Sequence, residues 1–318
     1  MLLAKAQARK GDLASAQAEL IALAKSPSSS TDVHTTLGAV YLAKRDLLRA
    51  RQSFGRALEL EPDSVEALAG LIQIDLADKK VADVRARLER RRTSAPRDIR
   101  VLLLAGVTFA ALGEPRESES MFKRVIQIDP ANLGAYDKLA RLYLSERRLD
   151  EARGQFEEVA RREPKSIAAT TMVGMILELQ NKPDEARKRY EQVLATDPQA
   201  AIAANNLAWA YAQNGGNLDL ALQLAQTAKS KMPDRHEVND TLGWIYYKKG
   251  LSTPAIASFK QSVSGDPNNA VYWYHLGLAY VQKGDKAEAR RSLEQALKLK
   301  SNFDGADEAR KILQSLQG

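Results

Sequence analysis

The sequence predicts an all-α solenoid in which helix–turn–helix repeats stack along the chain. Three observations predict this fold class: regularly spaced prolines, apolar residues at helical spacing between them, and columns of small residues with the same period. The prolines of the series are Pro62, Pro96, Pro130, Pro164, Pro198, Pro233 and Pro267. Their intervals are 34, 34, 34, 34, 35 and 34 residues, and such a period is typical of repeated helix pairs.

The proline series also sets the boundaries of the repeats. When each proline is counted as position 32, one truncated repeat precedes eight full ones. The ranges are 1–30, 31–64, 65–98, 99–132, 133–166, 167–200, 201–235, 236–269 and 270–303. We assign the extra residue of the repeat at 201–235 to the Gly215–Gly216 turn. The chain, 1–318, is therefore predicted to be a single solenoid, although its length suggests about two domains.

Each repeat carries two apolar stripes. Positions 4, 7, 8 and 11 share one face of a first helix because they follow the i, i+3, i+4, i+7 spacing, and positions 20, 24 and 27 form the stripe of a second helix. Position 8 is often glycine and position 20 is often alanine, as in Gly277 and Ala289. Small residues there allow the two helix axes to approach closely, while large residues at positions 7, 11 and 24 fill the remaining space.

Glycine and proline mark the predicted helix ends. The glycines at position 15 are Gly11, Gly113, Gly215, Gly250 and Gly284. A left-handed conformation at this position ends the first helix. Proline at position 32 ends the second helix, because proline lacks an N–H and disfavours helix in the residue before it. Pro115, Pro183 and Pro254 lie where a second helix begins, a place that accepts proline.

The repeat at 270–303 has the most specific pattern. It reads Trp273-x2-Leu276-Gly277-x2-Tyr280, followed by Ala289 and Ala296. This pattern resembles the tetratricopeptide repeat (TPR), and the resemblance covers nearly the whole chain. It implies that the repeats bury their apolar faces on their neighbours and stack into a right-handed superhelix.

The two ends differ in pattern. Residues 304–316 are predicted to form a capping helix, apolar on one face and charged on the other. The first helix opens with Leu2 and Leu3 and has no polar cap, so we expect further sequence upstream, or homo-oligomerisation through this end. The compartment stays open between the cytoplasm and, with an upstream signal, the periplasm or outer membrane.

The composition argues against an enzyme. The chain has no Cys and three His, namely His34, His236 and His275, and none is spaced as a metal ligand of another. No phosphate-binding glycine loop occurs, and no apolar run is long enough to span a membrane. We therefore predict no catalytic, cofactor-binding or metal-binding residues.

The positive charge is concentrated in one helix. The net charge is +7, and residues 85–100 carry seven Arg against Glu89 and Asp98. A uniform nucleic-acid groove is therefore not favoured. If this helix binds an anionic partner, the contact patch consists of Arg85, Arg87, Arg90 and Arg92. The alternative is an ordinary solvated helix face. Because Asp75 and Arg91 occupy the apolar positions 11 and 27, we also predict that the repeat at 65–98 is the least stable internal one.

The resemblance implies that positions 2, 5, 9, 12 and 13 of the first helices face a ligand. From such positions we assign eight residues to a partner-binding groove: Asn205, Trp209, Asp240, Trp244, Tyr247, Tyr274, Arg141 and Asp137. Aromatic rings beside Asn and Asp suit the recognition of a peptide. The other interpretation, that Trp209 and Trp244 pack between neighbouring first helices, is equally open. The Lys and Asn set with which chaperone-binding members hold a terminal carboxylate does not occur at these positions.

The functional hypothesis is a non-catalytic scaffold that binds a protein or peptide. Asn205-Asn206-Leu207-Ala208-Trp209 and Asp240-Thr241-Leu242-Gly243-Trp244 are similar to segments of bacterial TPR proteins of the exopolysaccharide-export and PEP-CTERM type. The resemblance implies a role in assembly at the bacterial cell envelope. The alternative is the recruiting arm of a larger TPR-containing enzyme, such as a glycosyltransferase.

Overall fold

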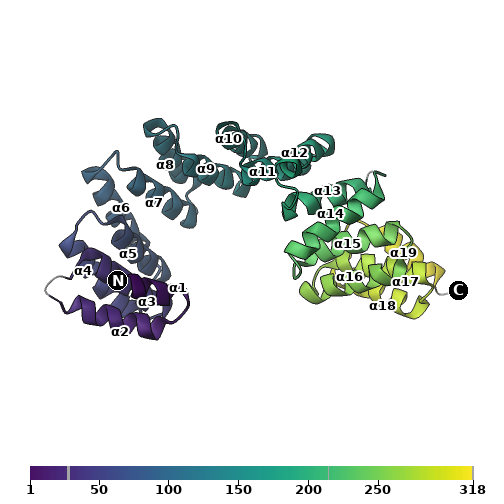
Figure 1. Ribbon diagram of the computed structural model, residues 1–318, viewed down its shortest axis with the longest axis horizontal. Helices are drawn as coiled ribbons and strands as arrows, with labels where there is room; N and C mark the ends of the chain where they lie inside the picture. Colours follow the sequence, from purple (N-terminus) through teal and green to yellow (C-terminus); the bar gives the residue numbers. More distant parts are fainter. Residues whose placement is uncertain (27–28, 214, 317–318) are drawn as a thin grey trace. The chain divides into compact units, whose positions relative to one another are not determined.

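The computed structural model describes residues 1–26, 29–213 and 215–316, and the regular structure within them is helical throughout (Figure 1). The chain groups into two compact parts, which we call the N-terminal half (Met1–Arg148) and the C-terminal half (Leu149–Gly318). Each half is a series of antiparallel helix pairs, so the predicted α-solenoid of helix–turn–helix repeats is confirmed.

The N-terminal half holds the helices of the first repeats. They are α1 (Leu2–Arg9), α2 (Leu13–Ala24), α3 (Thr31–Ala43), α4 (Leu47–Leu60), α5 (Val65–Ala77), α6 (Val81–Ser94), α7 (Ile99–Ala111), α8 (Pro115–Ile128) and α9 (Leu133–Ser145). Odd-numbered helices are the first helices of their repeats and even-numbered ones the second. Pro115 is the first residue of α8, as its position in the repeat predicts.

The C-terminal half continues the same alternation. Its helices are α10 (Leu149–Arg162), α11 (Ile167–Leu179), α12 (Pro183–Thr196), α13 (Ala201–Gln213), α14 (Leu218–Lys231), α15 (His236–Lys248), α16 (Ser252–Gly265), α17 (Ala270–Lys283), α18 (Lys286–Leu299) and α19 (Ala306–Ser315). The last of these is the predicted capping helix, with Ala306 and Ala309 buried and Asp307, Glu308 and Arg310 exposed.

Glycine at position 8 lets the ring at position 24 of the same repeat lie against the backbone of the first helix. A Cβ added at Gly106 would lie 2.4 Å from Phe122, and one added at Gly174 would lie 2.5 Å from Tyr190. These distances are too short for any Cβ contact, so the close helix approach depends on glycine. Gly38 and Gly243 meet the rings of Phe54 and Phe259 in the same way, and Gly277 meets the side chain of Leu293.

Position 15 adopts the left-handed conformation whether or not it is glycine. The five glycines predicted there have φ between 68° and 85°. In the remaining repeats the position is Arg45, Lys79, Arg147 or Asn181, with φ between 56° and 62°. The turn geometry is therefore a property of the repeat, and four repeats adopt it at a steric cost that glycine would avoid.

The repeat at 65–98 replaces two apolar residues by charged ones, and both charges are paired. The Asp75 side chain is completely buried and accepts from Arg51 on α4 at 2.5 Å and from Arg87 on α6 at 2.7 Å. Burial raises the pKa of the Asp75 carboxyl, but these two hydrogen bonds outweigh it and hold the pKa below its ordinary value. The carboxylate therefore stays charged and ties α4 to α6.

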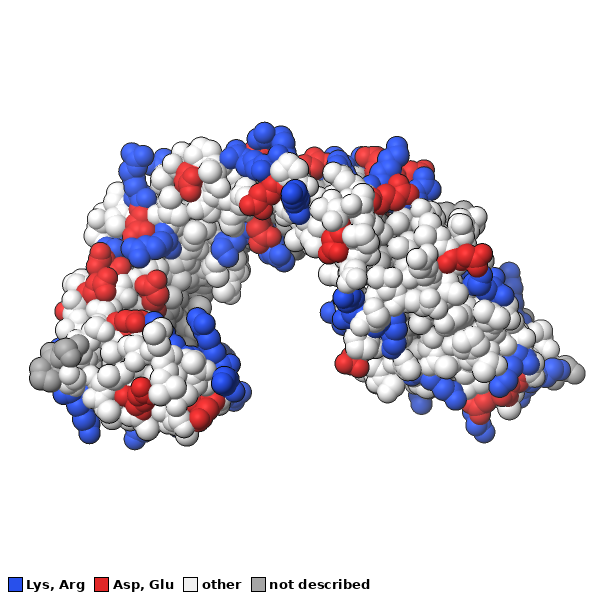
Figure 2. Space-filling view, viewed as in Figure 1, with Lys and Arg blue, Asp and Glu red and all other residues white. Residues whose placement is uncertain are grey.

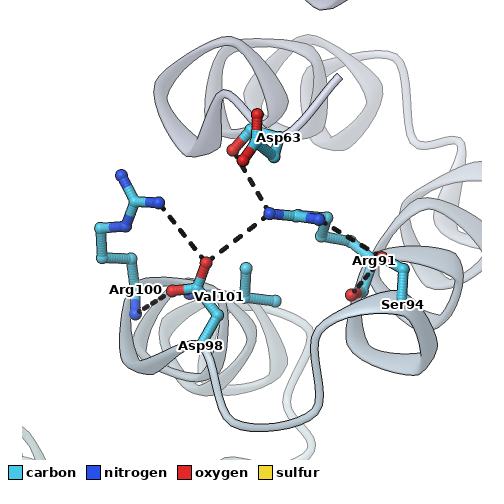
Figure 3. A network of polar contacts seen from close by, with 6 residues as sticks. All are labelled: Asp63, Arg91, Ser94, Asp98, Arg100 and Val101. Carbon is cyan, nitrogen blue, oxygen red and sulfur yellow. Dashed lines mark hydrogen bonds and ion pairs between the residues drawn. The ribbon is translucent and has the colours of Figure 1, made fainter. Parts of the chain in front are cut away.

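The second replacement, Arg91, joins α6 to two neighbouring loops (Figure 3). Its guanidinium donates to the backbone carbonyl of Asp63 at 3.5 Å and lies 3.6 Å from the carboxylate of Asp98. Asp98 in turn caps α7 by accepting from the backbone N–H groups of Arg100 and Val101. A long cationic side chain thus links consecutive repeats at a position where most other repeats have a small or apolar residue.

Candidate functional site

Aromatic rings from α13, α15 and α17 pack together in the C-terminal half. The ring centroids of Trp209 on α13 and Trp244 on α15 are 6.0 Å apart, and Tyr247 lies 5.3 Å from Trp244. Trp244 is buried, with 9% of its surface exposed, while Trp209 and Tyr247 are half-buried. Trp244 therefore forms the floor of this aromatic cluster, and Trp209 and Tyr247 form the part that a partner can contact.

His275 on α17 lies beneath Trp244 and completes the cluster. Its ring centroid is 4.5 Å from that of Trp244, and its Nδ1 lies 2.9 Å from Oδ1 of Asp240. Both His275 and Asp240 are buried, so the hydrogen bond satisfies two polar groups that would otherwise be costly to bury. Asp240, predicted to face the ligand, thus serves the packing of neighbouring first helices.

Sequence reasoning did not connect His275 with Asp240. The two residues stand at positions 6 and 5 of consecutive repeats and are 35 residues apart. A comparison of polar residues at neighbouring positions of adjacent first helices would have indicated this contact. His275 also has the rings of Phe259 and Tyr274 within 5.5 and 5.7 Å, which places it at the centre of the cluster.

Tyr274 connects the aromatic cluster to the capping helix. It is buried, and its hydroxyl donates to Oε2 of Glu308 on α19 at 2.6 Å. Burial, and then this hydrogen bond to Glu308, raise the pKa of Tyr274. Phe303 meets the same ring edge-on at 5.6 Å. Tyr274 therefore fixes α19 on α17 in this structure.

Two polar atoms in this region have no hydrogen-bond partner within the part of the chain that the structure describes. They are Nε1 of Trp244, a donor, and Oδ1 of Asn205, an acceptor. Both atoms are covered by neighbouring side chains. Unpaired buried polar atoms are uncommon because each costs about 1–3 kcal/mol, so they mark a place where packing is not optimised for stability alone.

Asp137 and Arg141 belong to the N-terminal half and pair with each other. Nε of Arg141 lies 2.9 Å from Oδ2 of Asp137, one turn earlier on α9. Arg141 is largely exposed and lines a hollow of about 290 Å³ together with Val107 and Lys138. The floor of this hollow is mostly apolar.

The arginines of α6 are mostly paired with acidic side chains. Arg85 reaches Glu114, Arg87 reaches Asp75, and Arg92 reaches Glu89 at 2.9 Å. Arg90 has no acidic partner among the residues that the structure describes. Figure 2 shows acidic and basic side chains beside one another over α5 and α6. The local charge is therefore partly neutralised by neighbouring repeats.

Residues 1–26, 29–213 and 215–316 contain no group of three or more His, Asp or Glu arranged to hold a metal ion. None of the helices described there is long and apolar enough to cross a membrane.

At the first helix, α1, the side chains of Leu2 and Leu3 are 88% and 60% exposed.

Models of the tetratricopeptide repeat family match most of the chain. The matched residues are 41–106, 109–176, 174–235, 236–269 and 270–303. The chain is also 26% identical over 110 residues to "Putative cellulose synthase operon protein C" of Escherichia coli O157:H7. The matched segment is 35% of this chain and spans 10% of that protein's length.

Two solved structures superpose on more than two thirds of the chain. The crystal structure of the APC/C hetero-tetramer Cut9–Hcn1 superposes with a TM-score of 0.59 at 16% identity, covering 97% of this chain and 60% of that chain. PilW, a type IV pilus biogenesis factor, superposes with a TM-score of 0.54 at 20% identity, covering 68% and 98%. At these identities the likeness shows the fold. The repeat pattern, the helix pairs and the family matches agree: the chain belongs to the tetratricopeptide repeat family.

Proposed function

We propose that the chain is a non-catalytic scaffold that binds a peptide or protein partner along the first helices of its C-terminal half. The observation that carries the proposal is the row of rings formed by Trp209, Trp244 and Tyr247 at positions that face the ligand in this family. Rigid rings provide a large contact area with little loss of conformational freedom, and they dominate the energetics of many protein interfaces.

The neighbouring polar groups support a peptide as the ligand. Asn205 lies one turn before Trp209 on α13, and its Oδ1 has no partner within the described chain. This atom is covered in the present structure, so a peptide N–H reaches it only when the Asn205 side chain rotates outward, whereas apolar side chains of the partner can lie on Trp209 and Tyr247 without such a change. We therefore place the contact surface on Asn205, Trp209 and Tyr247, with Trp244, Asp240 and Tyr274 as the layer that holds these residues in position.

We place this scaffold in a bacterial cell-envelope or exopolysaccharide assembly. Two similarities support the setting: the segments that end at Trp209 and Trp244 resemble TPR proteins of that group, and the relative from Escherichia coli is named for a cellulose synthase operon. The second candidate is the recruiting arm of a larger enzyme such as a glycosyltransferase. The matched segment spans 10% of that relative's length, so repeats similar to these occur in a much longer protein, and this observation favours the second candidate. The encoded sequence upstream of Met1 discriminates, because a signal peptide supports the first setting and a catalytic domain the second.

The test compares three full-length forms as bait: the wild type, Trp209→Ala and Trp273→Ala. Trp273 is a matched control because it is also half-buried but lies at position 4, where its Nε1 donates to the carbonyl of Pro267. We expect Trp209→Ala to lose the captured partner while retaining the helical circular dichroism of the wild type. Equal capture by all three forms would show that the aromatic cluster is not the binding surface.

A further inference from the structure

A large cavity lies between the second helices α6 and α8 of the N-terminal half. Its volume is about 770 Å³, within the range of about 300–1,000 Å³ that is usual for ligand sites. The buried side chains of Leu102 and Met121 form its floor. Its lining includes none of the ligand-facing positions of the first helices, so it is separate from the surface proposed above. We call it the basic hollow.

The second helix α6 contributes less buried apolar bulk than α8. On α6 the residues buried are Val84 and Leu88, whereas α8 buries Ser118, Met121, Phe122 and Val125. The side chains that α6 turns to the hollow are Glu89, Arg92 and Thr93, so its wall on this side is polar.

The rim of the basic hollow has an excess of positive charge. Its cations are Arg92, Arg116, Lys123 and Arg124, and its anions are Glu89 and Glu119. Glu89 pairs with Arg92, and Glu119 accepts from Lys123 at 2.6 Å and from Arg148 at 2.7 Å.

Two of the rim cations have no acidic partner. Arg116 has no polar partner among the residues that the structure describes, and Arg124 donates to Oε1 of Gln127 at 3.2 Å. Both side chains belong to exposed residues of α8. The two guanidinium groups are therefore available to carboxylates that do not belong to this chain.

We propose that the basic hollow binds an acidic peptide segment of a partner protein. Carboxylates of that segment pair with Arg116 and Arg124, and an apolar side chain contacts Leu102 and Met121. Polar side chains on the rim, among them Thr93 and Ser120, can hydrogen-bond to the peptide backbone. A nucleic acid fits less well, because the lining has no aromatic ring on which a base could stack.

Fluorescence anisotropy with the full chain tests this proposal. The probe is a short fluorescein-labelled peptide in which Glu alternates with Leu and Gly, and the comparison probes are the same peptide with Gln for each Glu and an oligothymidylate of equal length. The test variant is Arg116→Gln with Arg124→Gln. The matched control is Lys188→Gln with Lys298→Gln, which removes the same charge from exposed residues of α12 and α18.

We expect the test variant to weaken binding of the acidic peptide by at least about tenfold while the control retains the wild-type affinity. We also expect the affinity to fall as salt is added, because exposed charges are screened. Circular dichroism and the urea midpoint establish that both variants are folded. The proposal is wrong if the Gln peptide or the oligothymidylate binds as tightly as the acidic peptide, or if both double variants lose affinity equally.

Discussion

Nε of Arg87 lies 2.7 Å from Oδ2 of Asp75, and the Asp75 side chain has no exposed surface. The other oxygen accepts from Arg51, so one buried carboxylate is shared by two second helices. Asp75 stands at position 11, where most other repeats have an aromatic residue. The repeat has thus exchanged apolar packing for a charged network centred on Asp75, and removal of Asp75 takes the buried partner from both arginines.

Asp75→Ala should destabilise the chain by about 2–4 kcal/mol, because both arginines lose their buried partner. Asp78→Ala is the matched control, since Asp78 also pairs with Arg51 but is 33% exposed, and we expect it to cost less than about 1 kcal/mol. Urea unfolding followed by circular dichroism measures both. Equal effects of the two substitutions would mean that burial of Asp75 adds nothing to the pair.

Hydrogen exchange should show the repeat at 65–98 as the least protected internal repeat. Its second helix α6 buries Val84 and Leu88, and helices with few buried apolar residues open most readily. The ion pairs of Asp75 and Arg91 oppose this effect, but the arginines that pair with the buried Asp75 are 30% and 33% exposed, so water weakens these contacts. Protection of α5 and α6 equal to that of α7 and α8 would contradict the prediction.

Lys79→Gly should stabilise the chain by about 0.5–1 kcal/mol, because Lys79 has φ of 57° and glycine adopts this conformation without steric strain. The reverse change in the next repeat, Gly113→Ala, should destabilise by about 1 kcal/mol. Lys44→Gly serves as the control, since Lys44 is in the right-handed helical region with φ of −81° and gains nothing from glycine. Thermal and urea midpoints report the order of the three variants; stabilisation by Lys44→Gly as well would point to a cause other than φ.

Gly106→Ala should destabilise the chain by about 1–3 kcal/mol, because the new methyl group would lie 2.4 Å from the buried Phe122 ring. Gly154→Ala provides the contrast: Gly154 lies inside α10 with no atom within 4 Å of an added Cβ. There alanine should stabilise by up to about 1 kcal/mol through helix propensity. Unfolding midpoints that move in the same direction for both substitutions would refute the proposed role of glycine at position 8.

Glu119 should make stability depend on acid pH. The hydrogen bond from Arg148, joined by those from Lys123 and Tyr143, lowers the pKa of Glu119 from 4.5 to about 2. A lowered pKa in the folded state gives stability above pH 4.5 that is lost as the pH falls toward 2. Glu119→Gln should therefore remove about 2–3 kcal/mol at neutral pH and reduce the loss below pH 4.5.

The control for this prediction is Glu59→Gln. The Glu59 carboxylate also meets an arginine, Arg56, at 2.6 Å, but it is 66% exposed. Its removal should leave both the neutral-pH stability and the acid limb nearly unchanged. Urea titrations at a series of pH values compare the three proteins. An acid limb of wild-type steepness in Glu119→Gln would show that Glu119 does not contribute to it.

Most of the fold could be predicted because its signals repeat. The proline period set the start of α17 at 270, and the structure begins this helix at Ala270. The left-handed turn was predicted from glycine alone, so the same turn at Arg45 and Lys79 was missed. Alignment of the repeats would have predicted the left-handed turn at these residues too, because the position in the repeat, rather than the residue type, determines the conformation.

The candidate site was less predictable. The repeat register placed Trp209 and Trp244 on adjacent first helices, but left open whether they face a ligand or pack together. In the structure Trp244 packs under Trp209 and over His275, so the two tryptophans differ in exposure although they share a position. This difference in exposure comes from the next repeat, which supplies His275. It could therefore not be predicted from the repeat that contains Trp244 alone.

By itself, the sequence determined the helix pairs, their boundaries and the small residues between them, because these depend on spacings within a single repeat. Only the tertiary structure decided the pairing of Asp75 with Arg51 and Arg87, of Asp240 with His275, and of Tyr274 with Glu308. Most of these contacts join different repeats. Their formation depends on which side chains meet across a helix–helix interface, and a periodic pattern does not encode that information.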